Sequence, residues 1–138
     1  MAGSVVKTVK SNKDGIEISI TMTSDASGDC DVGTFTAHGF LCSMIVEPEA
    51  GANDPTDSFD IALNDSVSLN VLGTAGNNLS NAAGMTLAER YITLASPNTL
   101  TDSFQDKIFF FKETLTLVGS NMGNAKVATI KFQFRRRL

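Results

Sequence analysis

Strict alternation of apolar and polar side chains in residues 16–23 is the feature that most limits how this chain can fold. The segment reads Ile-Glu-Ile-Ser-Ile-Thr-Met-Thr. Successive side chains of a β-strand point to opposite faces, so this period of two predicts a strand with one buried and one wet face. Upstream, Val5, Val6 and Val9 form a shorter β-prone stretch, and turn-forming residues 12–15 separate the two stretches. We therefore expect an N-terminal hairpin over about residues 1–24.

Similar β-rich runs recur along the rest of the chain. Residues 59–63 and 67–71 predict a second hairpin about a turn at 64–65, and two late runs at 108–118 and 126–134 are expected to pair with each other. A further strand is expected over residues 35–46. Gly-, Asn- and Pro-containing stretches at 49–56 and 73–84 predict long loops. One short helix is expected over residues 85–91.

Chain length and composition indicate a single globular domain. The chain has 138 residues, of which 42% are hydrophobic and 19% charged, and this balance is typical of neither disordered nor membrane-spanning proteins. Seven or eight short strands with at most one short helix favour an all-β fold, a single-domain antiparallel β-sandwich or jelly roll with long loops. We expect the domain to cover residues 1–138 and to end in a short basic tail at 135–138.

Catalytic chemistry has little support in the sequence. Hydrolytic and redox enzymes bring a nucleophile, a base and an orienting group together, and the base is most often histidine. The one histidine, His38, lies on a predicted strand, where a surface or edge position is the preferred interpretation. Acidic residues gather at 25–31 and 54–60, but their spacing matches no standard calcium loop, and no Cys or His spacing suits zinc. We expect a non-enzymatic protein with no cofactor, bound metal or small-molecule substrate.

Charge and segment lengths bear on where the chain acts. Its net charge of −4 argues against broad nucleic-acid binding, which usually needs a basic face. The N-terminus lacks the apolar stretch of a secretory signal, and no segment has the length of a membrane span, so we expect no membrane partner and folding in a cytoplasm. Cys30 and Cys42 are too few for a disulfide framework, and we expect both to be thiols.

Two segments near the C-terminus are candidate interfaces. Phe109, Phe110 and Phe111 would place aromatic side chains on both faces of one strand, so that strand is expected to be covered on both sides. The preferred cover is the second sheet and a loop of the same domain, and the alternative is a neighbouring subunit.

The second candidate segment is the tail that contains Arg135, Arg136 and Arg137. Guanidinium groups suit carboxylates and phosphates. Three interpretations stay open: a solvated tail, docking on an acidic protein surface, or contact with packaged nucleic acid.

Several segments resemble a group of small tailed-phage and prophage proteins. They are Gly39-Phe40-Leu41, residues 55–65 (Pro-Thr-Asp-Ser-Phe-Asp-Ile-Ala-Leu-Asn-Asp), residues 71–77 (Val-Leu-Gly-Thr-Ala-Gly-Asn) and the closing segment 115–126. The likeness covers about residues 33–132 and is poor between 84 and 107; the first 30 residues and the arginine tail lie outside it. These motifs consist mostly of strand and turn residues, so they specify a fold better than a role.

The resemblance implies a non-enzymatic virion component. Within that class, a capsid decoration or cement protein on the outer head surface fits a small acidic β-domain, with the major capsid protein and further copies of the chain, as a dimer or trimer, for partners. Repeated weak contacts add up in such an assembly. A phage neck, tail or adsorption component is the alternative. A carbohydrate- or surface-binding module is an alternative of another class, although the chain has no Trp and one Tyr.

Overall fold

Antiparallel strands are the main elements of the described structure. The computed structural model describes residues 3–73, 76–81 and 109–136, apart from the side chains of residues 31, 32 and 109. Six strands form one sheet in the order β1-β2-β6-β3-β5-β4. Within those ranges a single 3-10 turn, η1 (Gly51–Asn53), is the one helical element. The strands are β1 (Ser4–Ser11), β2 (Gly15–Thr23), β3 (Cys30–Pro48), β4 (Asp60–Asn64), β5 (Phe109–Ser120) and β6 (Val127–Arg135).

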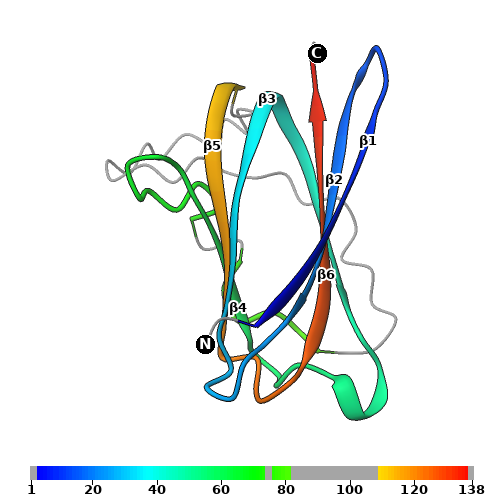
Figure 1. Ribbon diagram of the computed structural model, residues 1–138, viewed down its shortest axis with the longest axis vertical. Coiled ribbons are helices and arrows are strands. Elements are labelled where there is room, and N and C mark those ends of the chain that lie inside the picture. Colours follow the sequence, from blue (N-terminus) through cyan, green and yellow to red (C-terminus); the bar gives the residue numbers. More distant parts are fainter. Residues whose placement is uncertain (1–2, 74–75, 82–108, 137–138) are drawn as a thin grey trace.

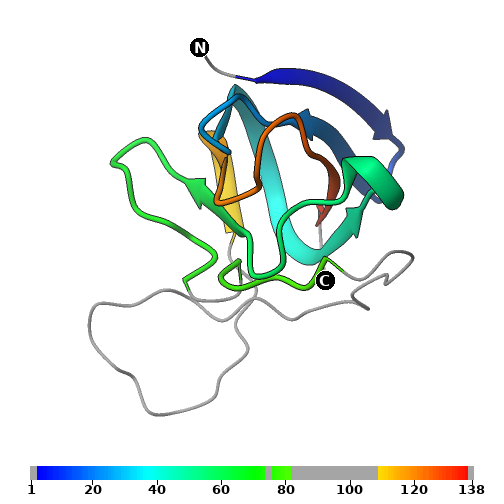
Figure 2. The same ribbon diagram turned by 90° about the horizontal axis from the view of Figure 1, so that it is seen from below.

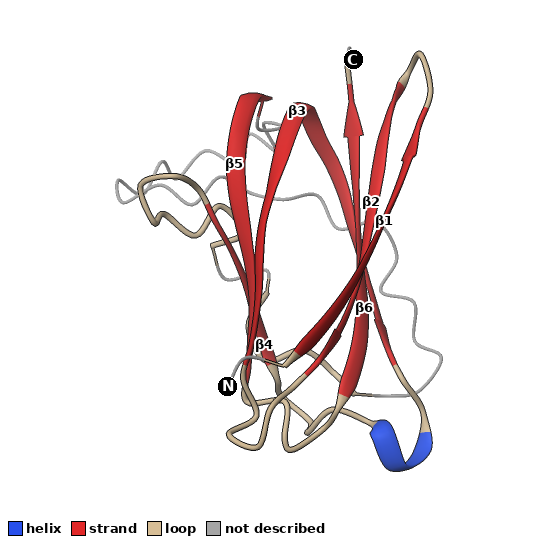
Figure 3. Ribbon diagram, in the orientation of Figure 1, coloured by secondary structure: helices blue, strands red, loops and turns tan. Residues whose placement is uncertain are grey.

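The long strand β3 folds this one sheet into two facing layers. Its first part pairs with β5 and its second part pairs with β6. Figure 1 shows β3 rising beside β5, turning over, and descending beside β6. Gly39 lies at the turnover with φ +120°, a value that other residues rarely adopt, and an added Cβ there would lie 2.7 Å from the carbonyl oxygen of Arg135. The all-β, single-domain, sandwich-like fold predicted from the sequence is confirmed (Figure 3).

One hydrophobic core fills the space between the layers. Figure 2 shows the two layers from below. The alternation in β2 operates as predicted, because Ile18, Ile20 and Met22 are buried. Two aromatic pairs join the layers, Phe35 with Phe132 and Phe110 with Phe134, each with ring centroids 6.1 Å apart. Burying each such ring stabilises the fold by about 2 kcal/mol.

β-Bulges change the phase of the inward-facing residues. In β3, Cys42 is an extra residue opposite the junction of two β6 residues, so burial moves from odd positions such as Leu41 to even positions such as Met44. In β5, Phe111 and Lys112 together face the single residue His38 of β3. Lys112 has φ +48°. These two bulges lie near the turnover of β3, and a third register shift, between Asp31 and Thr34, lies near the start of the strand.

One pairing expected from the sequence is wrong, and another forms only in part. β5 and β6 do not pair with each other, because β3 lies between them and bonds to both. Residues 67–71 turn back beside β4, with an isolated antiparallel bridge between Asn64 and Asn70, but they do not form a regular strand. There the Asp65 carboxylate accepts the backbone N–H groups of Val67 and Leu69, and this local alternative competes with strand pairing. The helix expected over residues 85–91 lies outside the described residues.

Candidate interaction surface

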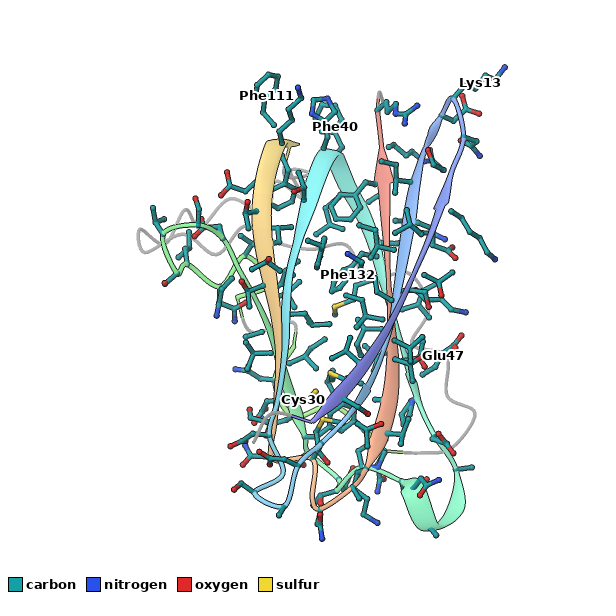
Figure 4. All side chains as sticks on the ribbon, viewed as in Figure 1. Lys13, Cys30, Phe40, Glu47, Phe111 and Phe132 are labelled. Atoms are coloured by element: carbon teal, nitrogen blue, oxygen red, sulfur yellow. The ribbon has the colours of Figure 1, made fainter. Side chains whose placement is uncertain are left out.

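The two candidate segments of the sequence meet at one end of the sandwich. Phe40, at the turnover of β3, is the register partner of Phe109 in β5 on one side and of Arg135 in β6 on the other. Figure 4 shows Phe40 and Phe111 projecting at this end. We call it the aromatic-basic end and define it by Phe40, Phe111, Lys112, Arg135 and Arg136.

Neighbouring phenylalanines in β5 have opposite roles. Phe110 points into the core and is 4% exposed, whereas Phe111 is 73% exposed. The bulge explains why the next residue, Lys112, is exposed as well. His38 stands beside Phe111, with ring centroids 5.5 Å apart and planes tilted by 59°. The described residues therefore cover Phe110 but leave Phe111 exposed, so the cover expected from the same domain is not seen at Phe111, and cover by a neighbouring subunit stays a prediction.

The arginines of the basic tail differ in their contacts. The side chain of Arg135 is exposed. Arg136 is exposed but also donates from Nη1 to the carbonyl oxygen of Asn12 at 2.8 Å and from Nη2 to Ser11 Oγ at 3.4 Å, while its backbone N–H donates to the carbonyl oxygen of Asp14. Arg136 thus holds the β1–β2 turn against the end of β6. Arg137 and the side chain of Phe109 lie outside the described residues.

Charge is distributed unevenly along the strand direction. The aromatic-basic end carries Lys112, Arg135 and Arg136, and the neighbouring β1–β2 turn adds Lys13. The turn also carries a carboxylate, Asp14.

The loops at the opposite end are rich in carboxylates. Asp25 begins the β2–β3 loop, and the backbone N–H groups of Asp29 and Ser27 donate to its carboxylate and hold its pKa below the ordinary value of 3.8. Asp60, near this end, accepts hydrogen bonds from the Asn121 side chain at 2.6 Å and from the backbone N–H of Asn78 at 2.8 Å. Both carboxylates accept hydrogen bonds from loop residues, so their first role is to stabilise the loops.

In the described part of the chain, the other polar side chains form no metal-binding cluster and no disulfide. Among those residues no group of three or more His, Cys, Asp or Glu side chains could hold a metal ion. Cys30 is buried beneath β1, and Cys42 is half-buried at the β3 bulge; neither forms a disulfide, as the sequence predicted. No helix among the described residues is long and apolar enough to cross a membrane.

Sequence reasoning missed two parts of this surface. Phe40 and Lys112 join it only because β3 turns over between β5 and β6 and because β5 bulges opposite His38. A signal was available in β3, where the apolar phase changes between Leu41 and Met44. Comparisons with protein-family models, with curated proteins and with solved structures find no match to this chain.

Proposed function

We propose that this chain is a non-enzymatic virion structural protein, a capsid decoration protein that attaches to the outer head surface through its aromatic-basic end. The observation that carries the proposal is the exposed ring of Phe111 beside Lys112, with the exposed Arg135 at the same end. Aromatic residues and arginine are enriched at protein interfaces, and an exposed ring loses water-accessible surface only when a partner covers it. The sequence resemblance to small tailed-phage proteins supplies the class of partner.

The chemistry of this end suits an acidic, partly apolar protein surface. The guanidinium of Arg135 can bind a carboxylate in a bidentate manner, and Phe111 can fill an apolar hollow beside it. The partner in this proposal is the major capsid protein, and the site of action is the capsid surface after assembly in the host cytoplasm. One such contact per copy is weak, but a shell offers the same contact many times.

A neck, tail or adsorption role would use the same surface. The number of copies in a particle separates these roles, so we would measure the copies per genome in purified parent particles by quantitative mass spectrometry. Hundreds of copies, in a simple ratio to the major shell protein, support head decoration. About six to a few dozen copies would move the chain to the neck or tail, because those parts use low-order rings. Absence from the particles would overturn the virion proposal.

A further inference from the structure

The two edges of the sheet differ in how the chain covers them. At the outer edge of β4, Ile61 N–H donates to the carbonyl oxygen of Gly76 and Val71 N–H donates to that of Leu63, both at 2.8 Å. Within the described residues, by contrast, no backbone hydrogen bond joins the outer edge of β1 to another segment. β1 also lacks proline and pairs with β2 in unbroken register over its eight residues. It therefore has none of the bulges or prolines that commonly block strand addition.

The hydrogen-bond pattern shows which groups this edge offers. Asn12 N–H, just after β1, donates to the carbonyl oxygen of Gly15. Ser24 N–H, just after β2, donates to the carbonyl oxygen of Lys126, just before β6. Hydrogen-bonded and non-hydrogen-bonded pairs alternate along an antiparallel ladder. Both bonds therefore show that the backbone N–H and C=O groups of the even-numbered residues of β1 point toward β2. The backbone N–H and C=O groups of the odd residues then point outward; these residues are Val5, Lys7, Val9 and Ser11.

The side chains of β1 are exposed as well. Val6 is 66% and Val9 53% exposed, and they lie on opposite faces of the strand, because Val9 faces the buried Ile18 while Val6 faces Thr21. An added strand would cover part of both valines. The edge therefore has apolar contact area in addition to four outward-facing peptide groups.

Charge indicates which strand fits. The turn end of β1 carries Lys10 and Lys13 and is bonded to Arg136, and these cations outnumber its two carboxylates, Asp14 and Glu17. The other end pairs Ser4 with Thr23 and adjoins the loop that contains Asp25 and Asp29. Figure 1 shows these two ends at opposite extremes of the hairpin. A second β1 that runs antiparallel places the lysine end of each copy beside the aspartate loop of the other. This complementarity occurs twice, as a two-fold axis requires.

We propose that the chain forms a symmetric dimer in which the β1 strands of two copies pair antiparallel about Thr8, joining two sheets into one. In this register Val5 is opposite Ser11, Val6 is opposite Lys10, and Lys7 is opposite Val9. No lysine lies directly opposite another lysine, and the two Lys7 side chains are diagonal neighbours on the same face, where like charges are farther apart than in a direct pair. Thr8 faces its own copy on the axis, and cross-strand threonine pairs are favourable.

The dimer places its two aromatic-basic ends at opposite extremes, because the two-fold axis is perpendicular to the sheet. A dimer lying along a shell could therefore contact two neighbouring capsomers. The dimer itself does not rest on the proposed virion role, since it follows from the edge and the charges of the isolated chain.

Analytical ultracentrifugation of the full chain tests the proposal. We expect wild type and Val9→Ala to sediment as dimers, with twice the mass of one chain. Val9→Pro should sediment as a monomer, because it removes an outward-facing N–H without breaking the β1–β2 ladder. Circular dichroism checks that each variant is folded. A wild-type chain that sediments as a monomer up to about 100 μM, where a micromolar interaction would be populated, overturns the dimer.

Charge exchange tests the orientation independently. Lys13→Glu or Asp29→Lys alone should raise the dissociation constant by about fivefold, since each affects two exposed ion pairs. The double variant should restore it. If the double variant instead binds itself more weakly than either single variant, the antiparallel arrangement is contradicted.

A disulfide tests the register. In the non-hydrogen-bonded pair on the axis the two Thr8 Cα atoms would be about 4.5 Å apart, within the range that a disulfide bridges. Thr8→Cys should therefore cross-link two copies on mild oxidation, whereas Val6→Cys, which lies opposite Lys10, should not. Equal cross-linking of the two variants would overturn the register.

Discussion

Arg136 donates from Nη1 to the carbonyl oxygen of Asn12 at 2.8 Å, so the end of β6 is joined to the turn between β1 and β2. A residue that the sequence places in a basic tail therefore also supports the fold. We expect Arg136→Ala to lower the free energy of unfolding by about 1 kcal/mol, the usual contribution of an exposed, charge-assisted hydrogen bond.

Urea denaturation checks this value against the neighbouring exposed residue. Arg135→Ala should change the free energy of unfolding by no more than about 0.5 kcal/mol, as surface substitutions usually do. Equal losses of unfolding free energy in the two variants would contradict a structural role for Arg136 that Arg135 lacks.

Phe110 and Phe111 give a second matched pair. Phe110→Ala should destabilise the fold by about 3 kcal/mol or more, because it leaves a cavity beside Phe134 in the core. Phe111→Ala should leave the free energy of unfolding within about 0.5 kcal/mol of wild type, since its ring is 73% exposed. Thermal and urea unfolding measure both values, and a large loss for Phe111→Ala would show that the ring packs within the fold.

Gly39 should tolerate no side chain. At φ +120° an added Cβ lies 2.7 Å from a backbone oxygen, whereas at Gly33, φ +73°, no atom lies within 4 Å of an added Cβ. Both substitutions by Ala carry backbone strain, but only Gly39→Ala adds a collision with β6. We expect Gly39→Ala to cost about 2 kcal/mol more than Gly33→Ala in urea unfolding, and equal costs would contradict the close approach of β3 and β6.

Asp25 predicts a dependence of stability on pH. Its folded pKa lies below the ordinary value of 3.8 because the backbone N–H groups of Asp29 and Ser27 donate to its carboxylate. A lowered folded pKa means that the ionised group stabilises the fold above pH 3.8, and this contribution is lost as the pH falls through the folded pKa.

Asp25→Asn removes the charge while it keeps an amide oxygen as an acceptor. The difference in unfolding free energy between wild type and Asp25→Asn should therefore be present at neutral pH and shrink in acid below pH 3.8. A difference that stays constant over this range would show that the charge of Asp25 does not matter.

The sequence was sufficient for the fold class and for β2, where strict alternation places Ile18 and Ile20 in the core. It was insufficient for pairing between distant strands. Nothing local in β5 or β6 indicates that β3 separates them, since that arrangement follows from the turnover at Gly39. Apolar alternation at Val67 and Leu69 was misleading because the Asp65 side chain bonds to their backbone.

The candidate surface was predictable in part for the same reason. Phe111 and Arg135 could each be selected by residue type, but their meeting on either side of Phe40 required the register of β3. The roles of Phe110 in the core and of Arg136 at the turn are tertiary properties. Residue type alone assigned both to the interface.

Attachment of purified variants to parent particles assembled without this chain tests whether the aromatic-basic end binds the capsid. Occupancy is measured as bound copies per particle across a range of protein concentrations. The control is Val67→Ser, because Val67 is an apolar residue of similar exposure on a loop outside the defined aromatic-basic end. We expect wild type and this control to bind alike, and the double variant Phe111→Ser with Arg135→Ser to bind at least about tenfold more weakly, a loss of about 1.4 kcal/mol. Binding of that double variant with wild-type affinity would contradict attachment through the aromatic-basic end.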